Sequence, residues 1–379
     1  MRSVDYLNQL IPFPSVSSTS NVAVSRWVEQ TLQKLEFQTE WLEYEDAAGL
    51  TKACVLGRRG PDAGRGFAYF CHTDVVPVES WSFPDSGPWE PLQTSDRLYG
   101  RGSCDMKGSL ACMLAAAESA QGEAATTPLY IVATADEEIG LIGARHIAAS
   151  SETYRDIVQR QCRAIIGEPT LLQVVHAHKG GRAMKVTSHG VAAHSSTGKG
   201  INANIAMIPF LSDLRELSLQ IEGQAAWQDD RFQPPTINMN IGINDHTGAL
   251  NITPAQSVCT VYFRTMPSID SPGLVDQIRS LAERHGLEFQ MMFQGESLFT
   301  DPQSAYVAEL LDVTKTDASQ TVAYGTDGSC LTELKDIVVL GPGDIRQAHT
   351  DDEWVSLDQL QKGTDLYGSL IQRWCLQAT

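Results

Sequence analysis

Short apolar runs alternate with stretches of helical period along the first half of the chain. Residues 66–71 and 128–134 are apolar and contain the Val, Ile, Phe and Tyr typical of strands, and the alanine-rich residues 109–121 between them predict a helix. This alternation indicates an α/β sheet with substantial parallel pairing. Histidines and acidic residues follow the apolar runs, at the strand ends where open α/β sheets place their ligand sites.

From residue 176 the pattern changes to strand, helix, two strands, helix and strand, which predicts a small α+β module inserted into the first domain. After residue 288 the α/β pattern resumes and ends in a helix over residues 357–372. The chain has 379 residues, more than the roughly 250–300 at which one hydrophobic core usually stops growing. We therefore expect a discontinuous catalytic domain over residues 1–175 and 288–379, and an inserted domain over residues 176–287.

The chain carries a formal net charge of −18, from 28 Lys and Arg against 46 Asp and Glu. Such a field repels phosphate backbones and anionic membranes, so neither nucleic acid nor a membrane is expected as a partner. The N-terminal segment lacks the apolar run of an export signal, and no stretch approaches the ~18 apolar residues of a membrane span. The 8 cysteines are scattered without a CxxC pair, which is typical of a reducing compartment, so we expect a cytoplasmic protein without a disulfide framework or zinc finger.

The first candidate site residues are His72 and Asp74, which follow the apolar run GFAYFC. Alternation along a strand places both side chains on one face, where the carboxylate of Asp74 can orient the imidazole. A metal-bound histidine usually donates its second ring N–H to such a carboxylate. Taken alone, however, a pair of this kind is more often a hydrogen-bonded structural pair.

Asp105 lies in a glycine-rich turn, LYGRGSCDMKGSLA, that leads into the alanine-rich helix. The turn lacks the G-x-x-x-x-G-K-[ST] spacing of a phosphate loop, and Asp105 stands where a dinucleotide fingerprint needs its third glycine. Two interpretations are equally supported: Asp105 caps the following helix, or its carboxylate approaches a metal ion.

Two adjacent acids, Glu137 and Glu138, end the predicted strand PLYIVATAD. Because neighbouring side chains in a strand point to opposite sides, one can bind a metal ion while the other faces the reacting water. A charged loop edge is the alternative for an isolated acidic run.

Glu168 ends the apolar run RAIIG and precedes Pro169, which keeps the backbone at residue 168 extended. His349 lies beyond a late apolar strand and a Gly-Pro-Gly loop, where a ligand from the returning half of the chain can close a site; on its own it is an ordinary loop histidine. Several carboxylates and two imidazoles without a thiolate suit a pair of divalent ions of the zinc, cobalt or manganese type.

Together these segments resemble the M20 metallohydrolase family, which includes aminoacylases, carboxypeptidase G2 and desuccinylases. The motifs that carry the resemblance span nearly the whole chain: CHTDVVPV, GRGSCDMKG, ATADEEIG, IIGEPT, HGVAAHSS and GPGDIRQAHTDDEW. Within the family, EPTLLQVVHAHKG, HSSTGKGINAN and QAHTDDEW are most similar to the acetylornithine deacetylase branch. The resemblance implies a zinc-aminopeptidase-like catalytic domain, with a mixed, mostly parallel sheet and helices on both faces, and an inserted ferredoxin-like α+β domain for dimerisation and lid closure.

The resemblance also implies two divalent metal ions per chain, with Zn²⁺ expected and Co²⁺ or Mn²⁺ as alternatives. The implied ligands are His72 and Glu168 for one ion, Glu138 and His349 for the other, and Asp105 as a bridge between both.

Further roles follow from the same resemblance. Asp74 would orient His72, and Glu137 would act as general acid and base. His194, in the inserted module, would stabilise the oxyanion at the active site of a neighbouring subunit, since the family is dimeric through that module. The expected reaction is hydrolysis of the amide of an N-acyl amino acid, N²-acetyl-L-ornithine to L-ornithine and acetate, in arginine biosynthesis.

Asn251 and Arg264 match module positions that in relatives contact the reacting centre and the substrate's carboxylate, a group that arginine binds well. A turn asparagine and a surface arginine are the alternative. One segment departs from the acetylornithine deacetylase pattern, because residues 324–329 read YGTDGS where Thr-Glu-Ala is usual. Substrate identity therefore stays open among N-acetylornithine, N-acetylcitrulline, N-succinyl-diaminopimelate and other N-acyl amino acids or dipeptides.

Other classes fit less well. His176-Ala-His178-Lys179 mimics the HxH pair of a single-chain amidohydrolase barrel, but such a pair belongs on a first strand and this one is mid-chain. Neither a G-x-S-x-G elbow nor an HExxH helix occurs. A non-enzymatic amino-acid-binding relative would have lost a metal ligand or the base, and none of these residues is missing.

Overall fold

The computed structural model describes residues 2–376 and divides the chain into two compact units. The first unit holds the described residues up to Ala177, then Phe299–Gln320, and then those from Thr326 onward. The second holds His178–Leu298 and Thr321–Gly325. The first unit is thus discontinuous along the chain.

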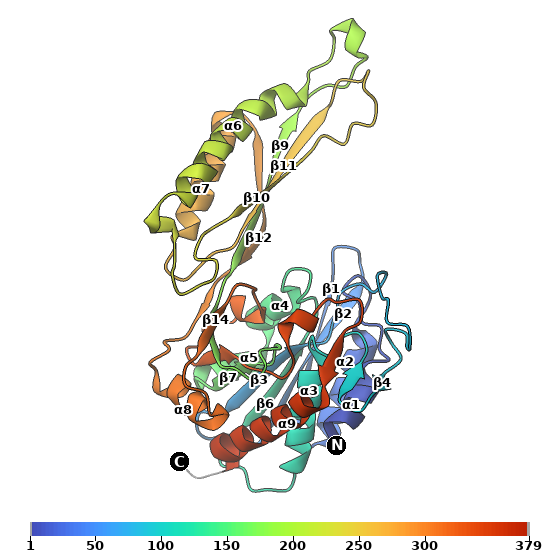
Figure 1. Cartoon of the computed structure of the whole chain (residues 1–379), viewed down its shortest axis with the longest axis vertical. Helices are drawn as coiled ribbons and strands as arrows, with labels where there is room; N and C mark the ends of the chain where they lie inside the picture. The colour runs from blue at the N-terminus through green and yellow to red at the C-terminus, as the bar shows by residue number, and fades with distance from the viewer. Residues whose placement is uncertain (1, 377–379) are drawn as a thin grey trace. The chain divides into compact units, whose positions relative to one another are not determined.

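A nine-stranded mixed sheet lies mainly in the first unit (Figure 1), although His178, Leu298 and residues 321–322 of its strands are grouped with the second. Its strands are β1 (Gln38–Glu45), β2 (Thr51–Arg59), β3 (Phe67–His72), β6 (Leu129–Thr134), β7 (Arg163–Ile166), β8 (Val175–His178), β13 (Leu298–Phe299), β14 (Gln320–Val322) and β15 (Ile337–Val339). The order is β1-β2-β6-β3-β7-β15-β8-β13, and β14 pairs with β8. The central strands β6, β3, β7 and β15 pair in parallel, so their carboxyl ends share one edge of the sheet.

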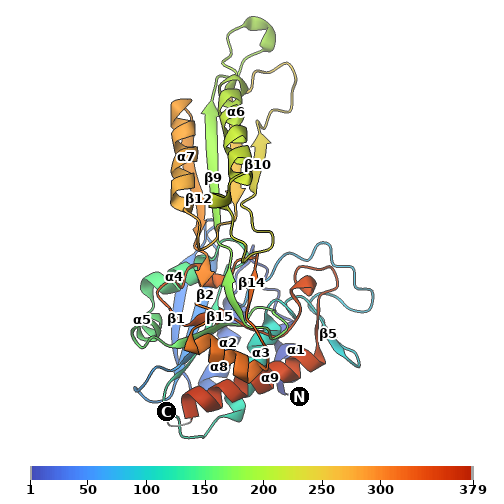
Figure 2. The ribbon, with the colours of Figure 1, turned by 60° about the vertical axis from the view of Figure 1, so that its left-hand side comes forward.

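Helices cover both faces of this sheet, and α4 and α5 lie on the side opposite α3 and α9 (Figure 2). The helices are α1 (Arg2–Leu10), α2 (Val22–Lys34), α3 (Lys107–Ser119), α4 (Ile142–Ser150), α5 (Glu152–Gln159), α8 (Ala305–Thr314) and α9 (Leu357–Ile371), with a π-helical turn over Gln372–Leu376 and 3₁₀ turns over Asp327–Ser329 and Ile345–Gln347. One apolar core is formed by side chains of α1, α2, α3, α8 and α9 and of the central strands. A small three-stranded sheet adds β4 (Leu92–Gln93), β5 (Arg97–Tyr99) and β16 (Trp354–Ser356), in the order β16-β5-β4.

Helix α3 is the alanine-rich helix expected from the sequence, displaced by two residues toward the N-terminus. Every residue from Lys107 to Ala117 is buried, because alanine, serine and cysteine side chains let the helix pack closely on all sides. Across residues 2–376, no helix combines the length and the apolar character needed to cross a membrane.

The second unit is a four-stranded antiparallel sheet with two helices against it (Figures 1 and 2). Its elements are β9 (Gly181–His189), α6 (Ala203–Glu222), β10 (Met239–Asn244), β11 (Gln256–Phe263), α7 (Ser271–Arg284) and β12 (Glu288–Gly295), with 3₁₀ turns over Ser195–Thr197 and Ala225–Trp227. The strand order is β10-β11-β9-β12. Because β12 pairs with β9, the unit extends beyond residue 287, where the sequence pattern placed its end.

Candidate metal centre

Three adjacent parallel strands deliver acidic and imidazole side chains to one edge of the first unit's sheet. In the order β6-β3-β7, β3 ends at His72, and β7 is followed closely by Glu168. β6 ends at Thr134, and the turn that carries Glu137 and Glu138 comes next. His72 and Thr134 are paired in register, so the two strand ends are level.

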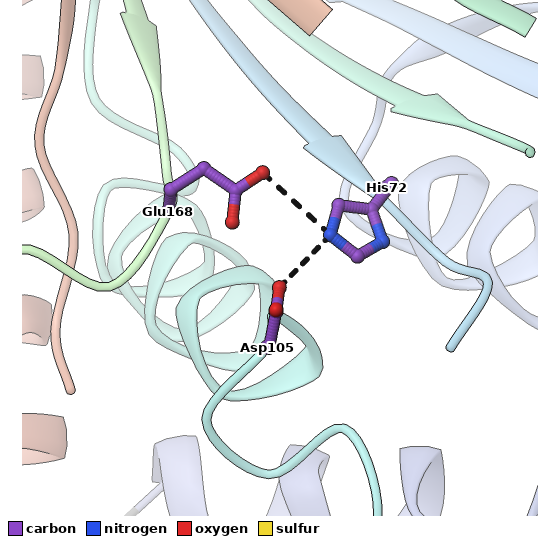
Figure 3. A group of neighbouring side chains, drawn as sticks. All are labelled: His72, Asp105 and Glu168. Atoms are coloured by element: carbon purple, nitrogen blue, oxygen red, sulfur yellow. Dashed lines mark hydrogen bonds and ion pairs between the residues drawn. The ribbon is translucent and has the colours of Figure 1, made fainter. Parts of the chain in front are cut away.

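A first group of possible metal ligands consists of His72, Asp105 and Glu168 (Figure 3). The Nε2 atom of His72 lies 3.0 Å from Asp105 Oδ1 and 3.6 Å from Glu168 Oε1. One donor atom from each residue lies within 4.8 Å of the others, and all three side chains are buried. A single ion can contact donor atoms at this spacing.

A second group consists of Asp105, Glu138 and His349. The Nε2 atom of His349 lies 3.1 Å from the carboxylate of Glu138 and 3.3 Å from Asp105 Oδ2. The side chain of His349 is 53% exposed, which leaves this side of the group open. Asp105 belongs to both groups, and its two oxygens face the two different histidines.

The charge of the two groups fits a pair of divalent cations. Burial raises the pKa of Glu168 well above its usual range, and the neighbouring Asp105 raises it further. Burial lowers the pKa of His72, but the carboxylates of Glu168 and Asp105 outweigh burial and hold that pKa well above its usual range. Three carboxylates and two imidazoles crowd together, so positive charge is favoured among them. Oxygen and nitrogen donors without a thiolate suit Zn²⁺, Co²⁺ or Mn²⁺.

Asp74 contacts more of the site than its expected role requires. The Nδ1 atom of His72 lies 2.9 Å from the carbonyl oxygen of Asp74 and 3.7 Å from its carboxylate. The carboxylate instead accepts hydrogen bonds from the backbone N–H groups of Glu137 and Glu138, over 3.2 and 3.3 Å, and from the Ser17 hydroxyl over 2.7 Å. Asp74 therefore orients His72 through its backbone and anchors the Glu137–Glu138 turn through its side chain.

The turn after β6 separates the two glutamates in a different way from the strand alternation expected from sequence. β6 stops at Thr134, and Asp136 adopts a positive φ of 56°, so Glu137 and Glu138 lie in a turn. The buried Lys52 donates to Asp136 over 2.5 Å, and the Tyr44 hydroxyl donates to the other oxygen of Asp136 over 2.8 Å. Glu138 joins the second ligand group, whereas Glu137 belongs to neither group.

The structure also separates the two interpretations of Asp105. Helix α3 has Met106 at its N-cap and no side-chain hydrogen bond there. The carboxylate of Asp105 faces His72 and His349 instead of capping the helix. Although burial opposes it, hydrogen bonds from the two histidines hold the pKa of Asp105 below its usual range.

The other three expected site residues lie in the second unit. His194 is exposed and pairs with Ile252 in an isolated β-bridge, next to Asn251, whose carbonyl oxygen accepts a hydrogen bond from Ser195 N–H over 2.9 Å. The guanidinium carbon of Arg264 lies 5.4 Å from the centre of the Tyr262 ring. His194 and Asn251 are thus neighbours within this unit.

Two buried carboxylates near the ligand groups of the first unit were not predicted from the sequence. Asp327, in the unusual segment 324–329, accepts a hydrogen bond from Thr134 Oγ1 over 2.6 Å, and burial raises the pKa of Asp327 to about 6. Glu353 binds the backbone of the turn that carries Asp105. The departure from the family pattern was a signal for the first residue, and the acidic run that follows His349 was a signal for the second.

The sequence profile of the peptidase family M20/M25/M40 matches residues 68–373, a range that holds both ligand groups. This chain belongs to that family. The M20 chain is 30% identical to an acetylornithine deacetylase of Myxococcus xanthus, over 97% of its own length and 96% of the relative's.

Solved structures confirm the fold of this M20 chain. The M20 family metallo-carboxypeptidase Sso-CP2 of Sulfolobus solfataricus superposes with a TM-score of 0.75 at 18% identity, over 99% of each chain. The YXEP protein of Bacillus subtilis, described as a dinuclear metal-binding M20 peptidase, gives a TM-score of 0.65 at 13% identity, over 97% of this chain and 96% of that one. The expected combination of an α/β catalytic fold and a separate α+β domain is therefore confirmed.

Proposed function

We propose that this M20 chain is a metal-dependent deacylase that hydrolyses N²-acetyl-L-ornithine to L-ornithine and acetate, as a step of arginine biosynthesis. The full-length similarity to an acetylornithine deacetylase carries the choice of substrate. The two ligand groups that share Asp105 support the chemistry. His72, Asp105 and Glu168 would hold one Zn²⁺ ion, and Glu138 and His349 would complete the other site with Asp105.

Glu137 is suited to proton transfer in this reaction. Bound metal ions supply a Lewis acid for the amide carbonyl and lower the pKa of a water molecule. Burial raises the pKa of Glu137, which makes its carboxylate a stronger base than an ordinary glutamate, suited to accept a proton and return it to the leaving amine. The hydrogen bonds from the Glu137 and Glu138 N–H groups to Asp74 fix the backbone from which Glu137 acts.

The contacts of His194 favour the tautomer that can donate a hydrogen bond to an oxyanion. Its Nδ1 atom accepts from the backbone N–H of Ser196 over 3.3 Å and lies 2.7 Å from the Ser196 hydroxyl. In a neutral imidazole the proton then resides on Nε2, which is free to face a substrate. We infer that His194 serves the active site of a second subunit, and that Arg264 and Asn251 contact the substrate.

The surface of the second unit supports a homodimer. Ile205 and Ile208 on α6 are 67% and 58% exposed, and Ile243 on the edge strand β10 is 62% exposed. Exposed apolar side chains beside an unpaired strand edge favour association with another chain. A second copy of this chain is the partner that an active site shared through His194 requires.

Mixed dimers test this arrangement. His194→Ala and Glu137→Ala should each be inactive, whereas coexpression of the two variants should restore about a quarter of wild-type activity. Half of randomly paired dimers are mixed, and in each of these one of the two sites keeps both residues. Mixed dimers isolated with two affinity tags that showed no activity would contradict action across the dimer.

The substrate is tested by amine release from chelator-stripped protein with and without added Zn²⁺ or Co²⁺. The panel contains N-acetylornithine, N-acetylcitrulline, N-succinyl-diaminopimelate and an N-acetyl dipeptide. We expect metal-restored turnover with the highest kcat/KM on N-acetylornithine. A higher value on another member would reject this substrate and direct attention to residues 324–329, and metal binding without turnover on any member would favour an amino-acid-binding protein.

A further inference from the structure

The carboxylate of Glu353 is saturated with hydrogen-bond donors from one short segment. Its Oε1 atom accepts from the backbone N–H groups of Cys104 and Asp105, over 2.8 and 2.9 Å. Its Oε2 atom accepts from the backbone N–H of Gly102 over 2.9 Å and from Arg101 Nη1 over 2.8 Å. Glu353 is completely buried, so no water competes for these donors.

This contact joins two segments that carry metal-ligand candidates. The turn of residues 101–105 ends in Asp105, the residue that both ligand groups share. Glu353 immediately precedes β16 and follows the loop that bears His349. One side chain thus ties the Asp105 turn to the segment that follows His349, 248 positions apart along the chain.

The turn around Glu353 has little room to adopt another arrangement. Gly102 has a φ of +78°, and a Cβ atom there would lie 2.8 Å from Val75 and 2.9 Å from Lys107. A Cβ atom on Gly343 would lie 2.7 Å from the sulfur of Cys104. Neighbouring side chains thus fill the space around the turn in the arrangement in which its N–H groups bind Glu353.

We propose that Glu353 is a positioning residue of the metal centre, which holds the Asp105 carboxylate between the two ligand groups. The proposal rests on the metal sites assigned above. It concerns the placement of the backbone, because the carboxylate of Glu353 bonds to the N–H groups of the Asp105 turn and to Arg101. Partners of metal ligands that fix their orientation typically contribute about 10–100-fold to metal affinity.

A carboxylate suits this position better than the isosteric amide. Each oxygen of Glu353 accepts from at least one backbone N–H. In Glu353→Gln, either orientation of the amide would place an NH₂ donor against a backbone N–H donor. The variant therefore loses hydrogen bonds to the turn while its volume is almost unchanged.

Glu40 offers a matched control in the first unit. Its carboxylate accepts from the backbone N–H groups of Glu152 and Thr153, both over 2.9 Å, and from the Ser151 hydroxyl over 2.7 Å. These contacts lie at the start of α5, and Glu40 belongs to neither ligand group. Glu40→Gln disrupts the same kind of hydrogen bonds between backbone N–H groups and a carboxylate, but in a segment that carries no ligand candidate.

The experiment measures Zn²⁺ affinity by chelator competition, the absorption spectrum of the Co²⁺-loaded protein, and thermal unfolding of the stripped protein. For Glu353→Gln we expect Zn²⁺ affinity about 10–100-fold weaker and an altered Co²⁺ spectrum. For Glu40→Gln we expect lower stability with wild-type affinity and spectrum. Glu353→Asp keeps the charge but is one methylene shorter, and should show an intermediate loss of affinity.

Wild-type affinity and spectrum in a folded Glu353→Gln protein would overturn the proposal. If that variant does not fold, Glu353→Asp decides, and wild-type metal properties there would overturn it as well. Equal losses of affinity in Glu353→Gln and Glu40→Gln would show a general effect of stability and reject the positioning role. Wild-type protein that binds no ions would instead refute the assigned metal sites, and the proposal with them.

Discussion

Replacing Glu137 with glutamine is expected to lower kcat by about 10²–10⁴-fold, the usual contribution of general acid–base catalysis, while both ions stay bound. Glu137 belongs to neither ligand group, so the amide removes a proton acceptor and leaves the donor atoms in place. Its backbone N–H still bonds to Asp74, which preserves the turn. Steady-state kinetics and metal analysis of the same preparation measure both effects.

The adjacent glutamate provides the control for this experiment. Glu138→Gln makes the same chemical change one residue further along, on a side chain 3.1 Å from His349 Nε2. We expect this variant to lose metal content together with activity. Loss of metal from Glu137→Gln would place Glu137 among the ligands and remove it from the role of base.

Chelator-stripped protein is expected to become less stable as the pH rises from about 5 to about 10. Burial raises the pKa of Glu168, Glu137 and Glu138 from an ordinary value of 4.5, so the folded chain binds protons that the unfolded chain releases. Hydrogen bonds that the His349 imidazole donates to the carboxylates of Asp105 and Glu138 raise the pKa of His349 from 6.5 to about 10, and the stability this gives below pH 6.5 is lost as the pH approaches 10.

The pKa shift of Asp105 has the opposite sign, but its effect on stability falls below this pH range. Its folded pKa lies below the ordinary value of 3.8, so its contribution is already complete above that pH. Zn²⁺ in 1,000-fold excess over its Kd stabilises a protein by about 4 kcal/mol per site, and it removes the repulsion between the carboxylates. Melting temperatures with and without Zn²⁺ should therefore diverge as the pH rises, and a stripped protein that gained stability with pH would contradict the assigned cluster.

The sequence could predict the residues that regular strands position. His72 ends one parallel strand and Glu168 closely follows the next, so the carboxyl ends of both strands meet at one edge, and the structure places His72 Nε2 3.6 Å from Glu168 Oε1. Strand alternation could not place Glu137 and Glu138, because a turn with Asp136 at positive φ begins before them. Side chains distant in the sequence fix that turn. The same holds for the Asp105 turn, and no local pattern could tell whether Asp105 is a ligand or a helix cap.

Long-range strand pairing also limited how well the sequence could predict the domain boundaries. The end of the second unit could not be placed because β12 joins β9, a strand about 100 residues earlier in the chain, by pairing rather than by any local signal. Glu353 was missed for a similar reason, since its partners at Cys104 and Asp105 are 249 and 248 positions away. An acidic residue next to a candidate ligand looks like solvated surface until its donors are known.

The position of β15 in the first unit's sheet has a consequence for synthesis on the ribosome. β15 lies between β7 and β8, although it comes almost last in the chain. The strands of the second unit all precede it, so that unit can fold on the emerging chain while β7 still waits for its neighbour. The unpaired edge of β7 is open to pairing with other nascent chains until residues 337–339 leave the exit tunnel. His349 follows only after β15, so the second ligand group is completed on the ribosome later than the first, whose three residues all precede β15.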